Sequence, residues 1–214
     1  MKISEIAVLA AIALSVAVGA YLYPQMPDMI ASHWDAAGNV NGYMPKFWGL
    51  FLMPLVALAM FALLVFIPRI DPLKANIEKF RGYFDGFIVL MTLFLLYVHA
   101  ISMLWNLGVA VNMNRIMPPA LGALLFYCGI LIEKAKRNWF IGIRTPWTLS
   151  NDTVWDKTHR IGGKLFKITG VIAVFGAFAG TYAFLFFIIP VVAATLFTTV
   201  YSYVLYRKLG RAKA

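Results

Sequence analysis

The sequence is organised as six long apolar runs, and almost all of its lysine and arginine residues fall between these runs. Each run approaches the roughly 20 residues that a helix needs to cross the hydrocarbon core of a membrane, because a helix rises about 1.5 Å per residue. With 62% hydrophobic and only 13% charged residues, the chain could not cover the surface of a soluble domain. The predicted fold class is therefore all-α, a polytopic membrane protein with six transmembrane helices. The predicted spans are residues 5–23, 47–67, 84–110, 116–132, 163–179 and 183–206.

The charges between the spans predict which way the helices cross the membrane. If the N-terminus lies in the cytoplasm, 17 of the 19 lysine and arginine residues fall on the inner side, and only Lys46 and Arg115 fall on the outer side. Cytoplasmic loops carry an excess of these residues, so both termini are predicted to be cytoplasmic. Orientation thereby explains the net charge of +10 without direct binding to nucleic acid. The inner residues are Lys2, Arg69, Lys74, Lys79, Arg81, Lys134, Lys136, Arg137, Arg144, Lys157, Arg160, Lys164, Lys167, Arg207, Lys208, Arg211 and Lys213.

The first apolar run has some features of a secretion signal. Lys2 precedes it, but the run is long and unbroken, and Tyr21 and Tyr23 stand where a cleavable signal carries small residues. We expect this run to be retained as the first span. The single cysteine, Cys128, lies in the fourth span, where we expect it to pack as a small apolar residue.

The outer segment between the first two spans, residues 24–46, is rich in polar and turn-forming residues. Residues 30–34 and 40–43 are predicted to form two short strands, with residues 37–39 in the turn between them. The pair Asn41-Gly42 is a strong turn signal and is predicted to end the second strand. A small hairpin over the outer mouth of the bundle follows.

Several side chains on this hairpin are candidates for contact with a ligand or partner outside the cell. An imidazole, a carboxylate and two amides could bind a cation, but the segment lacks the ligand spacing of a zinc site and the carboxylate number of a calcium loop. We expect no metal here. In the favoured interpretation the polar groups cap and solvate the hairpin and the aromatic rings anchor it at the lipid headgroups, with ligand recognition left open. The candidates are His33, Trp34, Asp35, Asn39, Asn41 and Tyr43.

The inner segment between the fourth and fifth spans, residues 133–163, carries the densest chemistry. Gly142 and Pro146 exclude a regular helix through its first half. The second half predicts an amphipathic helix, capped by Ser150 or Asn151, that runs along the inner surface into the fifth span. Three tryptophans in this segment indicate that it lies at the boundary between membrane and water, since indole rings favour that boundary.

Two interpretations of the charged residues in the inner segment stay open. Arg144 lies among apolar neighbours, so its guanidinium should pair with Asp152, Asp156 or a lipid phosphate, which would make the segment a structural loop. Alternatively, Asp156, His159 and Arg160 form an acid, base and guanidinium cluster together with Arg144. Ion-pair networks gather such groups without catalysis, so the structural interpretation is favoured.

Ionisable side chains within the spans are scarce, and His99 near the middle of the third span is the functional candidate there. An intramembrane histidine can move protons or bind a ligand, but a neutral imidazole bonded to a backbone carbonyl satisfies the same sequence. The chain has no Gly-rich phosphate loop, no nucleotide signature and no serine nucleophile motif. We therefore expect no cofactor, and an enzymatic activity is not favoured.

Two stretches of the chain resemble a known family. The inner stretch 138–162 contains Ile-Gly-Ile-Arg-Thr-Pro-Trp-Thr-Leu followed by Val-Trp and Thr-His-Arg, and it closely resembles the signature of the SdpI family of bacterial and archaeal membrane proteins. The outer stretch 32–38, with Asn-Gly-Tyr after it, resembles the uncharacterised domain that commonly precedes this signature. The inner motif residues are Asn138, Gly142, Arg144, Thr145, Pro146, Trp147, Trp155, Asp156, His159 and Arg160.

The resemblance implies two units in one integrated membrane domain: residues 1–68, a two-helix unit with the outer loop, and residues 69–214, an SdpI-like four-helix unit. It also implies an immunity protein of the cell membrane that protects against a secreted, membrane-active toxin peptide. In some members such a protein draws a cytoplasmic repressor to the membrane. The alternative, from another class, is a small transporter or membrane-embedded enzyme that uses His99 or the group of Asp156, His159 and Arg160.

Overall fold

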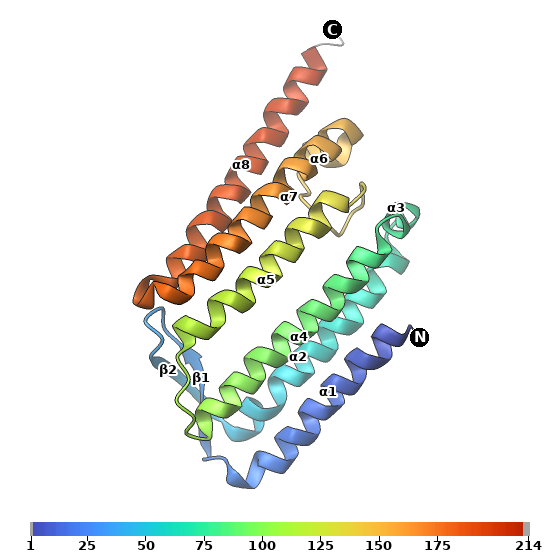
Figure 1. Ribbon diagram of the computed structural model, residues 1–214. Coiled ribbons are helices and arrows are strands. Elements are labelled where there is room, and N and C mark those ends of the chain that lie inside the picture. The colour runs from blue at the N-terminus through green and yellow to red at the C-terminus, as the bar shows by residue number, and fades with distance from the viewer. Residues whose placement is uncertain (1, 212–214) are drawn as a thin grey trace.

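The computed structural model describes residues 2–211 as a bundle of six long helices (Figure 1). All six are long and apolar enough to cross a membrane, which confirms the predicted all-α, six-span architecture. Lys213 of the inner charge set lies outside the described residues. The long helices are α1 (Ile3–Leu22), α2 (Lys46–Ile70), α4 (Arg81–Asn106), α5 (Met113–Lys134), α7 (Asp152–Phe175) and α8 (Ala183–Arg211).

Short elements close the two ends of the bundle. Strands β1 and β2 pair antiparallel, which confirms the predicted hairpin between the first two spans. At the other end, α3 follows α2, and α6 precedes α7. The short elements are η1 (Tyr23–Gln25), β1 (Met29–Trp34), β2 (Val40–Pro45), α3 (Lys74–Glu78), α6 (Pro146–Ser150), η2 (Gly176–Phe178) and η3 (Gly180–Tyr182).

The hairpin differs from the prediction at the Asn41-Gly42 pair. This pair does not end the second strand, because β2 continues to Pro45. The turn itself lies between the two strands, at the predicted residues 37–39. Asp35 stabilises it, because its Oδ1 accepts hydrogen bonds of 2.9 Å from the N–H groups of Ala37 and Asn39. Gly42 lies opposite His33 at an irregularity in the pairing. A carboxylate that bonds the backbone two residues on is a strong turn former and decides where the chain reverses.

The long helices pack as two groups. Helices α1, α2 and α4 share an apolar core that includes Ala57, Phe61 and Phe84. In the other group, α5 and α7 approach so closely that a Cβ added at Gly129 would lie 2.6 Å from the carbonyl oxygen of Gly163. Small residues at such a contact let two backbones come together, which is the usual way that helices gain contact area in a membrane.

The inner amphipathic stretch does not form a separate surface helix. It is the first part of α7, a continuous helix of 24 residues that begins at Asp152. The cap prediction is confirmed for Asn151, whose side chain accepts a hydrogen bond from the Val154 N–H at 3.1 Å. No proline interrupts the chain between the cap and the span, so the helix continues and the predicted start of the span at Gly163 falls inside it.

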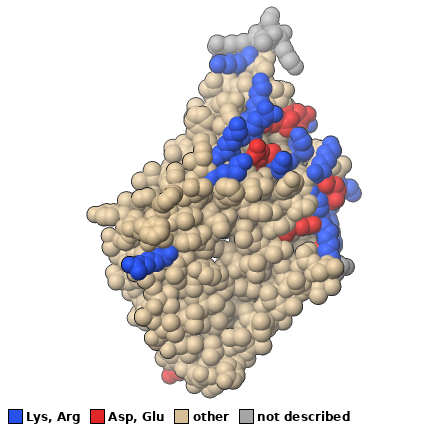
Figure 2. All heavy atoms as spheres, viewed as in Figure 1, with Lys and Arg blue, Asp and Glu red and all other residues tan. Residues whose placement is uncertain are grey.

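The charges gather at one end of the bundle. On the face that Figure 2 shows, most of the visible lysine and arginine side chains lie at the end where Figure 1 places α3, α6 and both ends of the described chain. The hairpin closes the opposite end. We name these the basic end and the hairpin end.

Candidate functional site

The inner loop between α5 and α7 is built on buried polar side chains that bond its own backbone. Asn138 is fully buried. Its Nδ2 donates to the carbonyls of Lys136 and Ile141, each at 2.8 Å, and its Oδ1 accepts from the N–H groups of Phe140 and Ile141. One amide thus satisfies four backbone groups, which a loop without regular structure could not otherwise bury.

His159 holds the loop from the side of α7. Its Nδ1 donates to the Trp155 carbonyl at 2.9 Å, and its Nε2 accepts from the Ile143 N–H at 3.0 Å. The Ile143 N–H can only donate, so this pattern requires a neutral imidazole with its proton on Nδ1. The Trp155 ring stacks on the imidazole with the ring centroids 3.9 Å apart. Trp155 Nε1 donates to the Ala135 carbonyl.

Gly142 is the residue that fits against this stacked pair. Its φ is +115°, and a Cβ added there would lie 2.4 Å from His159 Nε2. The backbone conformation and the close approach both require glycine. Gly142, Trp155 and His159, all predicted from the motif, therefore form one packed unit.

The remainder of the motif starts the short helix α6. Thr145 is its N-cap: Thr145 Oγ1 accepts from the Thr148 N–H at 3.2 Å, and the Thr145 N–H donates to Thr148 Oγ1 at 2.9 Å. Pro146 occupies the first helical position, where its missing N–H costs nothing. Trp147 packs on Tyr203 of α8, with the ring centroids 5.0 Å apart. These contacts tie the loop to the last helix.

The predicted pairing of Arg144 with a carboxylate of the following helix is wrong. Asp152 contacts Arg137 at 2.8 Å, and Asp156 contacts Lys136 at 3.3 Å. Arg144 instead donates to the Trp139 carbonyl at 2.7 Å and stays exposed. Each of the two carboxylates thus pairs with a cation other than Arg144. The spacing of these residues along the chain does not indicate which cation takes which carboxylate.

The catalytic interpretation of Asp156, His159 and Arg160 is not supported by their placement. His159 is buried and uses both ring nitrogens for backbone contacts, whereas Asp156 and Arg160 lie on the exposed side of α7. The cluster therefore does not converge on one point where a substrate could bind.

Two anchors of the inner loop were not predicted from the sequence. Asp71, at the end of α2, is 2% exposed, and its carboxylate accepts from the N–H groups of Leu73 and Trp139. Asn76 of α3 donates to the Arg137 carbonyl at 2.9 Å. The position of Asp71 directly after an apolar span could have indicated an anchor. Its long-range partner, the Trp139 N–H, is known only from the fold.

The hairpin end carries the second set of candidate residues. His33 Nδ1 contacts Ser32 Oγ at 2.9 Å, and Trp34 packs edge-on against Trp105 of α4. Asn106, also in α4, holds strand β1 through a pair of bonds with the backbone of Ala31: its Nδ2 donates to the carbonyl at 3.0 Å and its Oδ1 accepts from the N–H at 2.8 Å. The hairpin is therefore fixed over the bundle.

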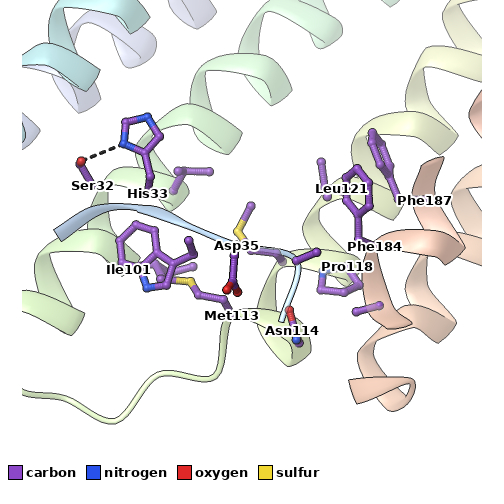
Figure 3. Close-up of a pocket in the computed structure, with 15 residues that line it drawn as sticks. Ser32, His33, Asp35, Ile101, Met113, Asn114, Pro118, Leu121, Phe184 and Phe187 are labelled. Atoms are coloured by element: carbon purple, nitrogen blue, oxygen red, sulfur yellow. Dashed lines mark hydrogen bonds between the residues drawn. The ribbon is translucent and has the colours of Figure 1, made fainter. Parts of the chain in front are cut away.

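An apolar cavity of about 320 Å³ lies under the hairpin (Figure 3). Figure 3 shows Ile101 of α4 on one side and Phe184 and Phe187 of α8 on the other. His33, Trp34 and Asp35 contribute to its wall from the hairpin, whereas the other predicted hairpin residues do not line it. Those other residues are Asn39, Asn41 and Tyr43, all exposed. The structure thus brings together half of the predicted outer set around one cavity.

A second cavity of about 510 Å³ lies at the basic end, between the two groups of helices. Its walls include Phe87 of α4, Cys128 of α5 and Thr198 of α8, and the loop contributes Gly142 and Arg144. The exposed Arg144 therefore lies at the wall of a largely apolar cavity.

His99 is buried, at 2% exposed, and lines neither cavity. Its Nε2 has no hydrogen-bond partner among residues 2–211. Within the same residues, no three histidine, cysteine or carboxylate side chains come together in a way that could hold a metal ion.

Comparisons with known proteins cover both ends of the bundle. The profile described as "SdpI/YfhL protein family" matches residues 134–202, which include the inner loop, and the profile described as "Domain of unknown function (DUF1648)" matches residues 10–58, which include the hairpin. The chain is 30% identical over 203 residues to the "Immunity protein SdpI" of Bacillus subtilis (strain 168), covering 94% of this chain and 95% of that protein. No solved structure matches. The chain is a multi-pass membrane protein that belongs to the SdpI family.

Proposed function

We propose that this protein is a membrane immunity protein that protects the cell against a membrane-active toxin peptide. The observation that carries the proposal is the similarity to an immunity protein over 94% of the chain, which includes the hairpin and the inner loop alike. A peptide that enters the membrane from outside would meet the hairpin end first, if that end faces outward. The charge distribution supports this orientation, because the basic residues gather at the opposite end.

The cavity under the hairpin gives this proposal a place of contact. It is walled by aromatic and aliphatic side chains of α4, α5 and α8, and a carboxylate and an imidazole lie at its hairpin side. Such a combination is typical of sites that bury an apolar group and fix its orientation through a few polar ones.

Protection can be tested in a Bacillus subtilis strain that lacks its own Immunity protein SdpI. The strain carries either this protein or an empty vector and is grown in competition with the parent strain, and survival and membrane potential are measured. We expect only cells with this protein in their membranes to survive at the parent's level. Equal loss of potential in both strains, with the protein present in the membrane, would refute the proposal.

The inner loop supports a second role, the recruitment of a cytoplasmic regulator. Trp139 is 51% exposed and follows the exposed Lys136 by three residues, and large exposed aromatic rings are common in binding surfaces. A photo-crosslinker at Trp139 should capture a soluble DNA-binding repressor, whereas one at Trp147, which packs on Tyr203, should not. Crosslinks to lipid alone at both positions would contradict this role.

His99 supports the competing class, a small transporter. The observation that favours proton or ligand movement is that its Nε2 lacks a hydrogen-bond partner among residues 2–211. Loss of protection in His99→Gln at unchanged membrane expression would favour transport, while full protection would favour binding.

A further inference from the structure

The two cavities are lined by the same faces of three helices. On α5, Leu121 lines the cavity at the hairpin end and Cys128 lines the one at the basic end. Cys128 lies about two turns after Leu121 and thus on the same helical face. On α4, Val98 and Phe87 line the two cavities and are about three turns apart, so they also share a face.

Helix α8 repeats this arrangement. Phe187 lines the cavity at the hairpin end and Thr198, about three turns further on, lines the cavity at the basic end. All three helices thus present one face to both cavities, and we call this shared face of α4, α5 and α8, with a cavity at each end, the groove. From Asn114 to Ile132 the groove covers roughly 27 Å at the rise of a helix, close to the thickness of about 30 Å of a bilayer's hydrocarbon core.

The ends of the groove carry opposite charges. Asp35 lies at the hairpin end, and Arg144, whose guanidinium makes no ion pair with any described residue, lies at the basic end. An α-helix has a partial positive charge at its N-terminus and a partial negative charge at its C-terminus, so this pair of residues favours one helix direction.

We infer that the groove binds one membrane-spanning apolar helix of a foreign peptide, with its free N-terminal amine at Asp35 and its C-terminus at Arg144. The inference rests on the proposed function, since it identifies the toxin segment that the immunity protein would bind. The apolar walls contact the helix along its length. Held in the groove, the helix is unable to assemble with other toxin molecules.

The native Cys128 provides a direct test, because it is the only cysteine of the chain and lines the groove. The protein is reconstituted in lipid vesicles with a synthetic leucine-alanine helix of membrane-spanning length that has free termini. Its single cysteine stands about four residues before the C-terminus, at the depth of Cys128 in the groove. We expect an oxidant to form a disulfide between this peptide and Cys128. The matched control is Cys128→Ala with Phe126→Cys, which places the thiol at nearly the same depth on an exposed side of α5. Equal crosslinking in both proteins would overturn the inference, and so would capture of a second copy of this chain in place of the peptide.

The charged ends are tested with a second peptide and a variant. Acetylation and amidation of the peptide, or Asp35→Asn combined with Arg144→Gln, should each lower crosslinking about fivefold, as expected for two helix-end interactions. No change in either case would contradict the assigned direction of the helix.

The competition assay separates failure of the groove from failure of the immunity role. Leu121→Trp fills the groove, whereas Ala123→Trp adds the same ring on an exposed side of α5. We expect loss of protection only for Leu121→Trp. Protection by both variants would refute the groove and leave immunity intact, whereas crosslinking without any protection by the wild-type protein would refute immunity alone.

Discussion

At the scale of single residues, Gly142 shows how the inner motif depends on backbone conformation. The sequence indicated that a regular helix could not pass through this position, and the structure adds the reason for glycine: a φ of +115° and direct contact with His159. A motif residue with no side chain thus has a role that is entirely steric.

Gly142→Ala should destabilise the protein by about 1–3 kcal/mol, because alanine is strained at this φ and its methyl group would collide with the imidazole. Gly82→Ala is the control, since Gly82 lies in α4 with open space around it. Thermal unfolding in detergent should show a lower Tm for the first variant and an equal or higher Tm for the second. Equal Tm values for Gly142→Ala and the wild type would contradict the packing described.

Asp71 is the residue on which the connection between α2 and the inner loop depends. Asp71→Asn keeps the shape but replaces one carboxylate oxygen by a donor, which would face the N–H of either Leu73 or Trp139. We expect a loss of about 1–3 kcal/mol in the free energy of unfolding. Chemical denaturation in detergent measures it, with the exposed Asp156→Asn as the control. Similar losses for the two variants would show that Asp71 has no special role.

Arg144 makes one hydrogen bond to a carbonyl and is exposed, so its contribution to stability should be small. Arg144→Lys should change the free energy of unfolding by about 0.5 kcal/mol or less, as is usual for exposed positions. This reverses the expectation from the sequence, in which a planar guanidinium clamps a carboxylate. A large loss of thermal stability in Arg144→Lys would contradict this small role and would show that the guanidinium itself is required.

At the scale of elements, the hairpin depends on α4 more than on its own two strands. A two-stranded hairpin is marginally stable by itself. Asn106 gives it a long-range anchor by bonding both backbone groups of Ala31. Ser102, one turn earlier in α4, adds a longer contact of 3.4 Å to the same carbonyl.

Asn106→Leu should therefore loosen the hairpin without unfolding the helices. We expect faster hydrogen exchange at the backbone of residues 29–45 and an unchanged rate in α7, because a buried backbone pair would lose both partners. Exchange measured by mass spectrometry in detergent distinguishes the two segments. Unchanged protection of residues 29–45 would show that Asn106 is not the anchor.

At the scale of the whole molecule, orientation follows from charge. The 17 to 2 distribution of lysine and arginine predicts a cytoplasmic basic end, and the structure gathers most of these residues at one end of the bundle. Which side of the membrane that end faces stays a prediction.

Cysteine labelling in intact cells measures the orientation. In a Cys128→Ala background, Asn39→Cys in the hairpin should react with a membrane-impermeant reagent, and Thr153→Cys at the start of α7 should react only after lysis. Both positions are exposed. The opposite pattern would invert the proposed topology, and with it the assignment of the hairpin as the surface that faces a toxin.

The sequence by itself determined the six helices, the hairpin and a helix cap at Ser150 or Asn151, of which the structure has Asn151. These features depend on local properties, namely the length of apolar runs and the presence of turn-forming and capping residues. Only the tertiary structure decided the partners of Arg144, Asp71 and Asn106, since several residues compete for each contact and the winner lies far away in the chain. The groove also belongs to the tertiary structure. In lipid, an apolar face that packs on a neighbour and one that stays open have the same composition, so only the arrangement of α4, α5 and α8 shows which face was left free.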